Sequence, residues 1–308
     1  MTAINAQPVI IIGAARSGTN LLRDLLCALP GVATWPCDEI NYVWRHGHRD
    51  FPSDEFTADM ATPRLARKVR GRFVKMARQS RCEFLVEKTC ANSLRVDFVR
   101  EVVPEARFLF LVRDGRDALL SADKRWKAKL DIPYLMAKAK YVPKTDLPYY
   151  ATQYLGHRLA RLMSREGRLS TWGPRFEGMD DYVRDHGLDA CCAKQWALSV
   201  ERAAEAFESF DEDAVHPMQY EDLVEDPVYE IGTACDFLGI DASDEQIEAV
   251  CDGVFGTSVG RWRTRFDRDR LATLAPILDP VLTQFGYEPC PVEADGTDAD
   301  AAPLRRAA

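Results

Sequence analysis

The first group of residues that could bind a ligand or take part in catalysis is a glycine-containing loop near the N-terminus. Residues 13–20 read GAARSGTN and separate a β-branched run from leucines at helical spacing. In a strand, loop and helix of this kind, backbone N–H groups converge on an anion. A nucleotide-binding P-loop carries lysine directly after its second glycine, but Thr19 follows Gly18 here and Arg16 is the loop's one cation. The loop predicts a phosphate cradle without the lysine that kinase chemistry uses. Taken alone, it also fits a glycine-rich turn without a ligand.

Two further charged clusters directly follow apolar runs. The run beginning at Phe84 ends in Glu87, Lys88 and Thr89, and the run 106–112 (ARFLFLV) leads into the sequence RDGRD at 113–117. Ligands of parallel α/β sheets bind at the carboxyl ends of the strands. We therefore expect these two clusters and the glycine loop to gather along one edge of a sheet.

The elements that must position these clusters alternate along the chain. Strands are predicted from the apolar runs at 9–12, 84–89, 106–112 and 214–220, and residues 62–79 and 190–210 have helical patterning. Ser93 can cap the helix that follows the second cluster. Short strands that alternate with helices imply right-handed crossovers. The predicted fold class is α/β: a three-layer, P-loop-like parallel sheet flanked by helices.

One domain is expected to span residues 1–290. Residues 130–188 break the strand–helix rhythm with prolines and aromatic residues, which predicts a helical insertion over the active site. A packed subdomain with a solvated surface fits this composition equally well. Residues 291–308 contain few large apolar side chains and are expected to be disordered.

The glycine loop and the third cluster together resemble sulfotransferases that use 3'-phosphoadenosine 5'-phosphosulfate (PAPS). Arg-Ser-Gly-Thr at a strand-to-helix turn resembles their phosphosulfate loop. Residues 111–121 resemble their 3'-phosphate motif, in which an arginine after a strand precedes a serine by eight positions. Arg125 is one helical turn beyond that serine. The resemblance assigns to the co-substrate Arg16, Ser17, Gly18, Thr19, Asn20, Arg113, Ser121, Arg125, Tyr220 and Ser258.

The candidate catalytic residues also follow from the resemblance, which is greatest to the tyrosylprotein, glycan and bacterial branches. The strand before Lys88 resembles the one whose terminal lysine reaches the sulfuryl group, and Arg16 would assist there. The segment around Glu39 resembles the one that supplies a general base. Asp38 is the nearest alternative. The cytosolic small-molecule enzymes use a histidine, for which the chain offers His46 and His48.

Two late segments resemble the family's remaining nucleotide contacts. Tyr220 follows the last predicted strand, where the family often has an aromatic near the adenine. Residues 258–263 (SVGRWR) resemble the loop that closes over the nucleotide, which makes Ser258 a candidate. The Arg-Lys-Gly that the cytosolic enzymes carry just upstream is replaced by Phe255-Gly256-Thr257.

Net charge and cysteine content exclude some classes of function for this protein. The 308-residue chain has a net charge of −8, which argues against general nucleic-acid binding. Its nine cysteines contain no CxxC spacing and its histidines lack metal-ligand partners, so reduced thiols in a cytoplasmic protein and no metal are expected. The apolar run 9–12 is too short for a signal peptide or a membrane span. The oligomeric state is not encoded in any recognisable pattern.

The basic segment is the only hint of the acceptor. Residues 124–175 contain twelve Lys or Arg and three acidic residues, a local charge of +9 in an acidic chain. A small-molecule or glycan acceptor is expected, with a solvated helical face as the alternative reading. The resemblance implies transfer of a sulfuryl group from PAPS to a hydroxyl, with 3'-phosphoadenosine 5'-phosphate (PAP) as product. The competing hypotheses are a P-loop kinase and a non-catalytic nucleotide-binding protein.

Overall fold

The computed structural model describes residues 3–126, 142, 145–149, 152 and 173–291. Most of the predicted insertion and the predicted tail lie outside these residues. The strands are β1 (Gln7–Ile12), β2 (Val32–Thr34), β3 (Phe84–Lys88), β4 (Arg107–Val112) and β5 (Val215–Gln219). They form one parallel sheet in the order β2-β3-β1-β4-β5. The predicted α/β class with a parallel sheet is confirmed.

Helices connect the strands and cover both faces of the sheet. The α-helices are α1 (Thr19–Cys27), α2 (Asn41–Trp44), α3 (Pro63–Ser80), α4 (Val96–Val102), α5 (Gly115–Trp126), α8 (Met179–Phe207), α9 (Tyr220–Glu225), α10 (Pro227–Leu238), α11 (Asp244–Cys251) and α12 (Arg268–Gln284). Short 3-10 helices are η1 (Ala58–Met60), η2 (Cys90–Leu94), η3 (Glu212–Ala214) and η4 (Arg261–Thr264). Helix α8 is bent at Gly187, whose backbone is not helical.

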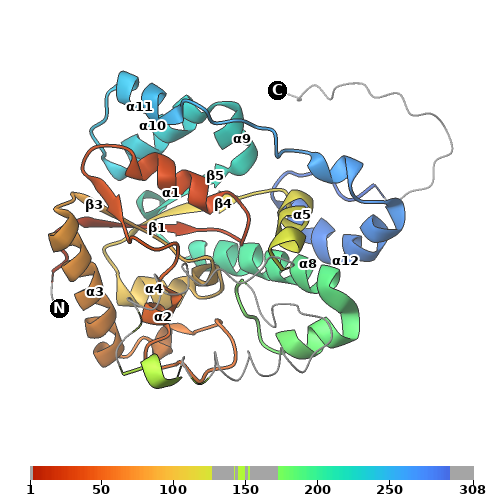
Figure 1. Ribbon diagram of the computed structural model, residues 1–308, viewed down its shortest axis with the longest axis horizontal. Helices are drawn as coiled ribbons and strands as arrows, with labels where there is room; N and C mark the ends of the chain where they lie inside the picture. Colours follow the sequence, from red (N-terminus) through yellow and green to blue (C-terminus); the bar gives the residue numbers. More distant parts are fainter. Residues whose placement is uncertain (1–2, 127–141, 143–144, 150–151, 153–172, 292–308) are drawn as a thin grey trace.

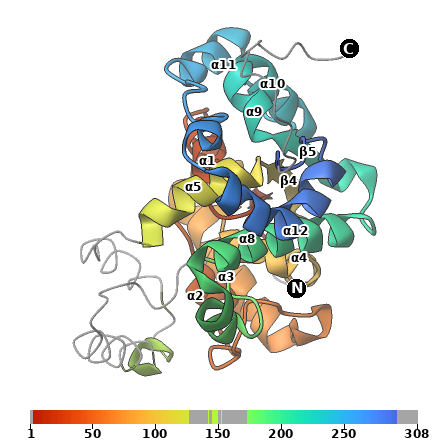
Figure 2. The same cartoon turned by 90° about the vertical axis from the view of Figure 1, so that its right-hand side faces the viewer.

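Strand β1 shows why the molecule has three layers. Its side chains alternate in direction, so Ile10 and Ile12 pack into one apolar core and Val9 and Ile11 into another. The first core is completed by α3, α4, α8 and α12, and the second by α1, α9, α10 and α11. Figures 1 and 2 show these two helix groups on opposite sides of the sheet. A strand buried on both faces explains its unbroken apolar sequence.

The segment after β3 differs from the sequence expectation. Ser93 does not cap a helix, because it lies inside η2, where its hydroxyl donates to the carbonyl of Cys90 at 2.7 Å. Helix α4 begins after Arg95, which makes no side-chain cap. The chain therefore turns tightly directly after Lys88 and keeps its polar side chains beside the end of the strand.

Candidate active site

The glycine loop packs closely against the neighbouring strand ends. Gly18 precedes α1 with φ +89°, and a Cβ there would lie 2.2 Å from the Tyr220 ring. A Cβ on Gly13 would lie 2.6 Å from the carbonyl oxygen of Leu111. Both positions therefore require glycine: Gly18 for its backbone conformation and both for space. Between them, Ser17 is fully buried, and its hydroxyl has no hydrogen-bond partner among the described residues.

Arg16 connects the glycine loop to the helix after β4. It adopts φ +73°, which is uncommon for a residue with a side chain. Its Nε donates to the hydroxyl of Ser121 in α5 at 2.9 Å. Two predicted phosphate ligands thus meet although they are 105 positions apart. Arg125 lies in the same helix, but its side chain is outside the described part of the structure.

Arg113 holds three segments together at the end of β4. Its guanidinium donates to the backbone carbonyls of Arg16 at 3.0 Å and Ser258 at 2.8 Å. The same group lies 4.2 Å above the Tyr220 ring, and the Tyr220 and Ser258 hydroxyls are 2.6 Å apart. Arg113 Nε is buried without a partner among the described residues. The structure therefore brings together four of the predicted nucleotide contacts.

Asp117 anchors the closing segment, residues 255–266, and was not singled out from the sequence. Its carboxylate accepts from the backbone N–H of Gly260 at 2.6 Å and of Trp262 at 3.0 Å. Burial raises the pKa of Asp117, although these two N–H groups oppose that shift. The Trp262 indole donates to Asp114, and the guanidinium of Arg116 lies 4.0 Å above the Trp262 ring. The repeated Arg-Asp of the RDGRD sequence was the available signal.

Lys88 lies between two carboxylates at the end of β3. Its Nζ is 3.0 Å from Glu39 Oε1 and 3.1 Å from Asp38 Oδ1. Burial alone would lower the pKa of Lys88, but the carboxylates of Glu39 and Asp38 outweigh it and raise the pKa above the usual range. The lysine is therefore a fixed cation. Asp38 is also bound by Arg23 at 2.9 Å, a contact that the sequence did not suggest.

Cys90 joins the Lys88 cluster to the glycine loop. Its backbone N–H donates to Glu39 Oε1 at 3.3 Å, and its sulfur lies 3.8 Å from the hydroxyl of Thr19. Burial raises the pKa of Cys90 to about 12, so it is a neutral thiol and not a nucleophile. The glycine loop therefore contacts the RDGRD cluster directly through Arg113, and it is linked to the Lys88 cluster through Cys90 and Glu39.

The two histidines considered as alternative bases have other partners. His46 Nδ1 lies 2.6 Å from Asp146, and its Nε2 lies 2.8 Å from Lys68 Nζ. His48 Nε2 is 2.9 Å from the carbonyl oxygen of Met60. Neither ring makes a contact with Lys88 in the described structure, whereas Glu39 does.

The residues present fit a nucleotide that carries phosphate and sulfuryl groups. Two buried polar atoms of the site, Ser17 Oγ and Arg113 Nε, have no hydrogen-bond partner among the described residues, whereas buried polar groups are almost always satisfied. Arg16, Lys88 and Arg113 supply cations from each of the three clusters. No group of three or more potential metal ligands occurs within the described ranges. None of the described helices is both long and apolar enough to cross a membrane.

The fold and the site fit an α/β enzyme that binds a phosphorylated nucleotide without a P-loop lysine. The model of the Sulfotransferase family matches residues 8–169 and 157–244. The chain belongs to this family and is a PAPS-dependent sulfotransferase, which leaves the kinase alternative without support. No protein of curated function matches the chain.

Solved structures share the fold at low sequence identity. The sulfotransferase domain from the curacin biosynthetic pathway has a TM-score of 0.54 and 13% identity, over 93% of this chain and 99% of that domain. The sulfotransferase STF9 from Mycobacterium avium has a TM-score of 0.51 and 15% identity, over 94% and 79%. The sulfotransferase domain of the Synechococcus PCC 7002 olefin synthase has a TM-score of 0.50 and 18% identity, over 94% and 98%.

Proposed function

We propose that the protein transfers the sulfuryl group of PAPS to a hydroxyl of a small-molecule or glycan acceptor, with Glu39 as general base. Glu39 accepts the acceptor's proton as the hydroxyl oxygen bonds to sulfur, and the bond between sulfur and the bridging oxygen breaks to release PAP. Lys88 and Arg16 stabilise the charge that develops on the leaving phosphate. The pair of Lys88 Nζ and Glu39 Oε1, 3.0 Å apart beside the glycine loop, is the observation that carries this proposal.

The nucleotide contacts form the second part of the proposal. Arg113, Ser121 and Ser258 bind the 3'-phosphate, while backbone N–H groups of the glycine loop bind the 5'-phosphosulfate. Ser17 Oγ and Arg113 Nε are buried donors without partners among the described residues, and both are suited to phosphate oxygens. Tyr220 is proposed to lie near the adenine.

Calorimetric titration with PAP, and separately with ATP and magnesium, tests the nucleotide part. Wild type is expected to bind PAP in the micromolar range and ATP weakly. Arg113→Ala should lose about 2 kcal/mol of PAP binding, the scale of a charged hydrogen bond. EDTA should leave PAP binding and transfer unchanged. Preference for magnesium ATP would contradict the proposal.

The acceptor class is proposed from composition alone. The basic segment 124–175 suits an anionic hydroxyl compound such as a glycan, and most of it lies outside the described residues. Transfer of labelled sulfate from PAPS to a panel of charged and neutral hydroxyl compounds tests this. The KM of the charged acceptors should rise with ionic strength. Indifference of KM to salt and to acceptor charge would count against an anionic acceptor.

The nine cysteines bear on where the enzyme works. All nine belong to the described residues, and all are free thiols. Free thiols of this number are typical of a reducing compartment, and on this basis we propose a cytoplasmic location. Fractionation of the native host cells, followed by detection of the protein, would test it.

A further inference from the structure

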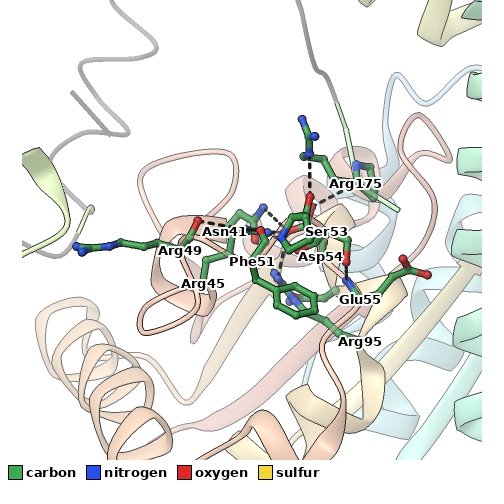
Figure 3. A network of polar contacts seen from close by, with 12 residues as sticks. Asn41, Arg45, Arg49, Phe51, Ser53, Asp54, Glu55, Arg95 and Arg175 are labelled. Atoms are coloured by element: carbon green, nitrogen blue, oxygen red, sulfur yellow. Dashed lines mark hydrogen bonds and ion pairs between the residues drawn. The ribbon is translucent and has the colours of Figure 1, made fainter. Parts of the chain in front are cut away.

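Asp54 is a buried carboxylate that lies outside the contacts described so far. It is 2% exposed and accepts hydrogen bonds from three separate parts of the chain, which Figure 3 shows converging on it. Arg45 NH1 lies 2.7 Å from Asp54 Oδ1, and Arg95 NH1 lies 3.4 Å from the same oxygen. The backbone N–H of Arg175 donates to Asp54 Oδ2 at 2.9 Å. A single carboxylate thus joins the segment after Glu39, the turn after β3 and residue 175 in the C-terminal part of the predicted insertion.

Arg95 extends this network to the strand that carries Lys88. Its side chain is fully buried, and burial lowers its pKa to about 10, although Asp54 opposes the shift. The Arg95 guanidinium donates to the side-chain oxygen Oδ1 of Asn92 at 2.9 and 3.0 Å, and the side-chain NH₂ of Asn92 donates to Glu87 at 2.9 Å. Glu87 directly precedes Lys88. A chain of hydrogen bonds therefore runs from Asp54 to the residue beside the proposed catalytic lysine.

The same network fixes the two residues that directly follow Glu39. The backbone N–H of Ile40 donates to the Thr89 hydroxyl at 3.2 Å, and that hydroxyl donates to Glu87. The Asn41 side chain accepts from Arg95 at 2.6 Å and donates to Asp54 at 3.3 Å. Because residues 40 and 41 are both held, the backbone that presents Glu39 to Lys88 has little freedom to move.

Residue 175 contributes its backbone to two bonds with Asp54. Its N–H donates to the Asp54 side chain at Oδ2, and its carbonyl accepts from the Asp54 N–H at 2.6 Å. Glu177 N–H also donates to Glu55 at 2.6 Å. Residues 175 and 177, in the C-terminal part of the predicted insertion, are therefore attached to the segment 54–55.

We propose that Asp54 is a positioning residue that sets Glu39 against Lys88 and fastens the end of the predicted insertion to the same point. It touches neither Glu39 nor Lys88 and acts through Asn41 and Arg95. The catalytic meaning of this position rests on the proposed function, because it assumes that Glu39 is the base. The statement that Asp54 immobilises residues 40 and 41 does not depend on the proposed function.

An ion pair elsewhere in the protein, in which the arginine is buried and the carboxylate is partly exposed, provides a control. Arg70 is buried and makes two bonds of 2.6 Å to Glu105. Glu105 lies just before β4, and its carbonyl accepts from Gln7 at the start of β1, so this pair is at the opposite edge of the sheet. Glu105→Gln therefore removes a carboxylate from a buried arginine without touching the site.

The test compares Asp54→Asn, Asn41→Ala and Glu105→Gln with wild type in four measurements. Hydrogen exchange reports the protection of the Ile40 amide, calorimetry reports PAP affinity, and thermal unfolding reports the melting temperature. Steady-state kinetics report kcat and KM with the best acceptor of the panel. We expect the two network variants to exchange the Ile40 amide at least tenfold faster. Their kcat should fall about 10- to 100-fold, the cost of a small misplacement of a catalytic group, with PAP affinity within twofold. Glu105→Gln should change melting temperature only.

Each outcome decides a separate statement. The proposal is wrong if the network variants match Glu105→Gln in Ile40 amide exchange rate and in kcat at an equal loss of melting temperature. Asp54 would then have only a structural role. Asn41→Ala keeps every charge of the network and removes a half-buried side chain, so it keeps the test valid if Asp54→Asn does not fold. If wild type transfers no sulfuryl group, the proposed function fails, while Ile40 exchange still decides whether Asp54 positions this segment.

Discussion

The two halves of the active site are built by different kinds of contact. On the nucleotide side, Arg113 donates to backbone carbonyls of the glycine loop and the closing segment, and Asp117 accepts from backbone N–H groups. On the base side, Lys88, Glu39 and the network around Asp54 are held largely by side chains bonded to side chains. The first half depends on loop conformation, and the second depends on charges that must all be present together.

This difference predicts how each half fails. A backbone contact survives most substitutions at the residue that supplies it, whereas a buried charge left without its partner is strongly destabilising. Changes on the nucleotide side should therefore alter affinity for PAP, and changes on the base side should alter turnover. Substitutions on each side of the site test that separation.

The largest effect is expected from Glu39→Gln. Loss of the general base should lower kcat by about 10²- to 10⁴-fold, while PAP affinity measured by calorimetry stays within twofold. Asp38→Asn is the control, because Asp38 shares Lys88 but is also bound by Arg23. A larger loss of kcat in Asp38→Asn than in Glu39→Gln would transfer the role of base to Asp38.

Gly18→Ala should damage the nucleotide side. The added Cβ would lie 2.2 Å from the Tyr220 ring, in a backbone conformation at φ +89° that disfavours side chains. Overpacking and strain of about 2–3 kcal/mol should weaken PAP binding by roughly 30- to 100-fold. Gly71→Ala, in α3, meets no atom within 4 Å and should stabilise the protein by up to about 1 kcal/mol. Unchanged PAP affinity in Gly18→Ala would show that the loop relaxes freely.

Glu87 makes the base side sensitive to pH. Burial raises its pKa from 4.5 to about 7, although the Thr89 hydroxyl favours the ionised form. The native state then retains a proton that the unfolded chain releases, so stability falls as pH rises from 4.5 towards 7. The loss should be about 1–3 kcal/mol and should disappear in Glu87→Gln. Urea unfolding at pH 5 and pH 7 measures it, and an equal slope in both proteins would contradict the shift.

Asp117→Asn should have the smallest effect. The amide keeps one acceptor for the N–H groups of Gly260 and Trp262 but brings a donor against the other. Loss of one such bond costs about 1 kcal/mol, so PAP should dissociate several-fold faster in stopped-flow measurements. Turnover at saturating PAPS should not fall. A fall in kcat without faster PAP release would mean that the two halves are not separable.

Whether a part of the site could be predicted depended on how far apart its residues are in the sequence. The glycine loop, the strand ending at Lys88 and the RDGRD sequence are each one continuous stretch, so their residue types and spacing could be interpreted directly. The base network could not be predicted, because Asp54 and Arg95 are 41 positions apart and meet only in the folded protein. The expected cap at Ser93 was wrong for the same reason, since Arg95 and Asn92 stabilise a 3-10 turn there through bonds to each other and to Glu87.

The backbone bonds between Asp54 and Arg175 have a consequence for how this enzyme could diversify. Because the N–H and the carbonyl of residue 175 make two of the bonds, these two do not depend on which side chain stands there, whereas the bond from Arg175 Nε to the Pro52 carbonyl does. The stretch between α5 and residue 175 could therefore be exchanged during evolution, or replaced by that of a relative in the laboratory, without changes to Glu39, Lys88 and the residues around Asp54. Acceptor specificity and catalytic activity could then evolve independently. Chimeric proteins that test this would be joined near residues 126 and 175.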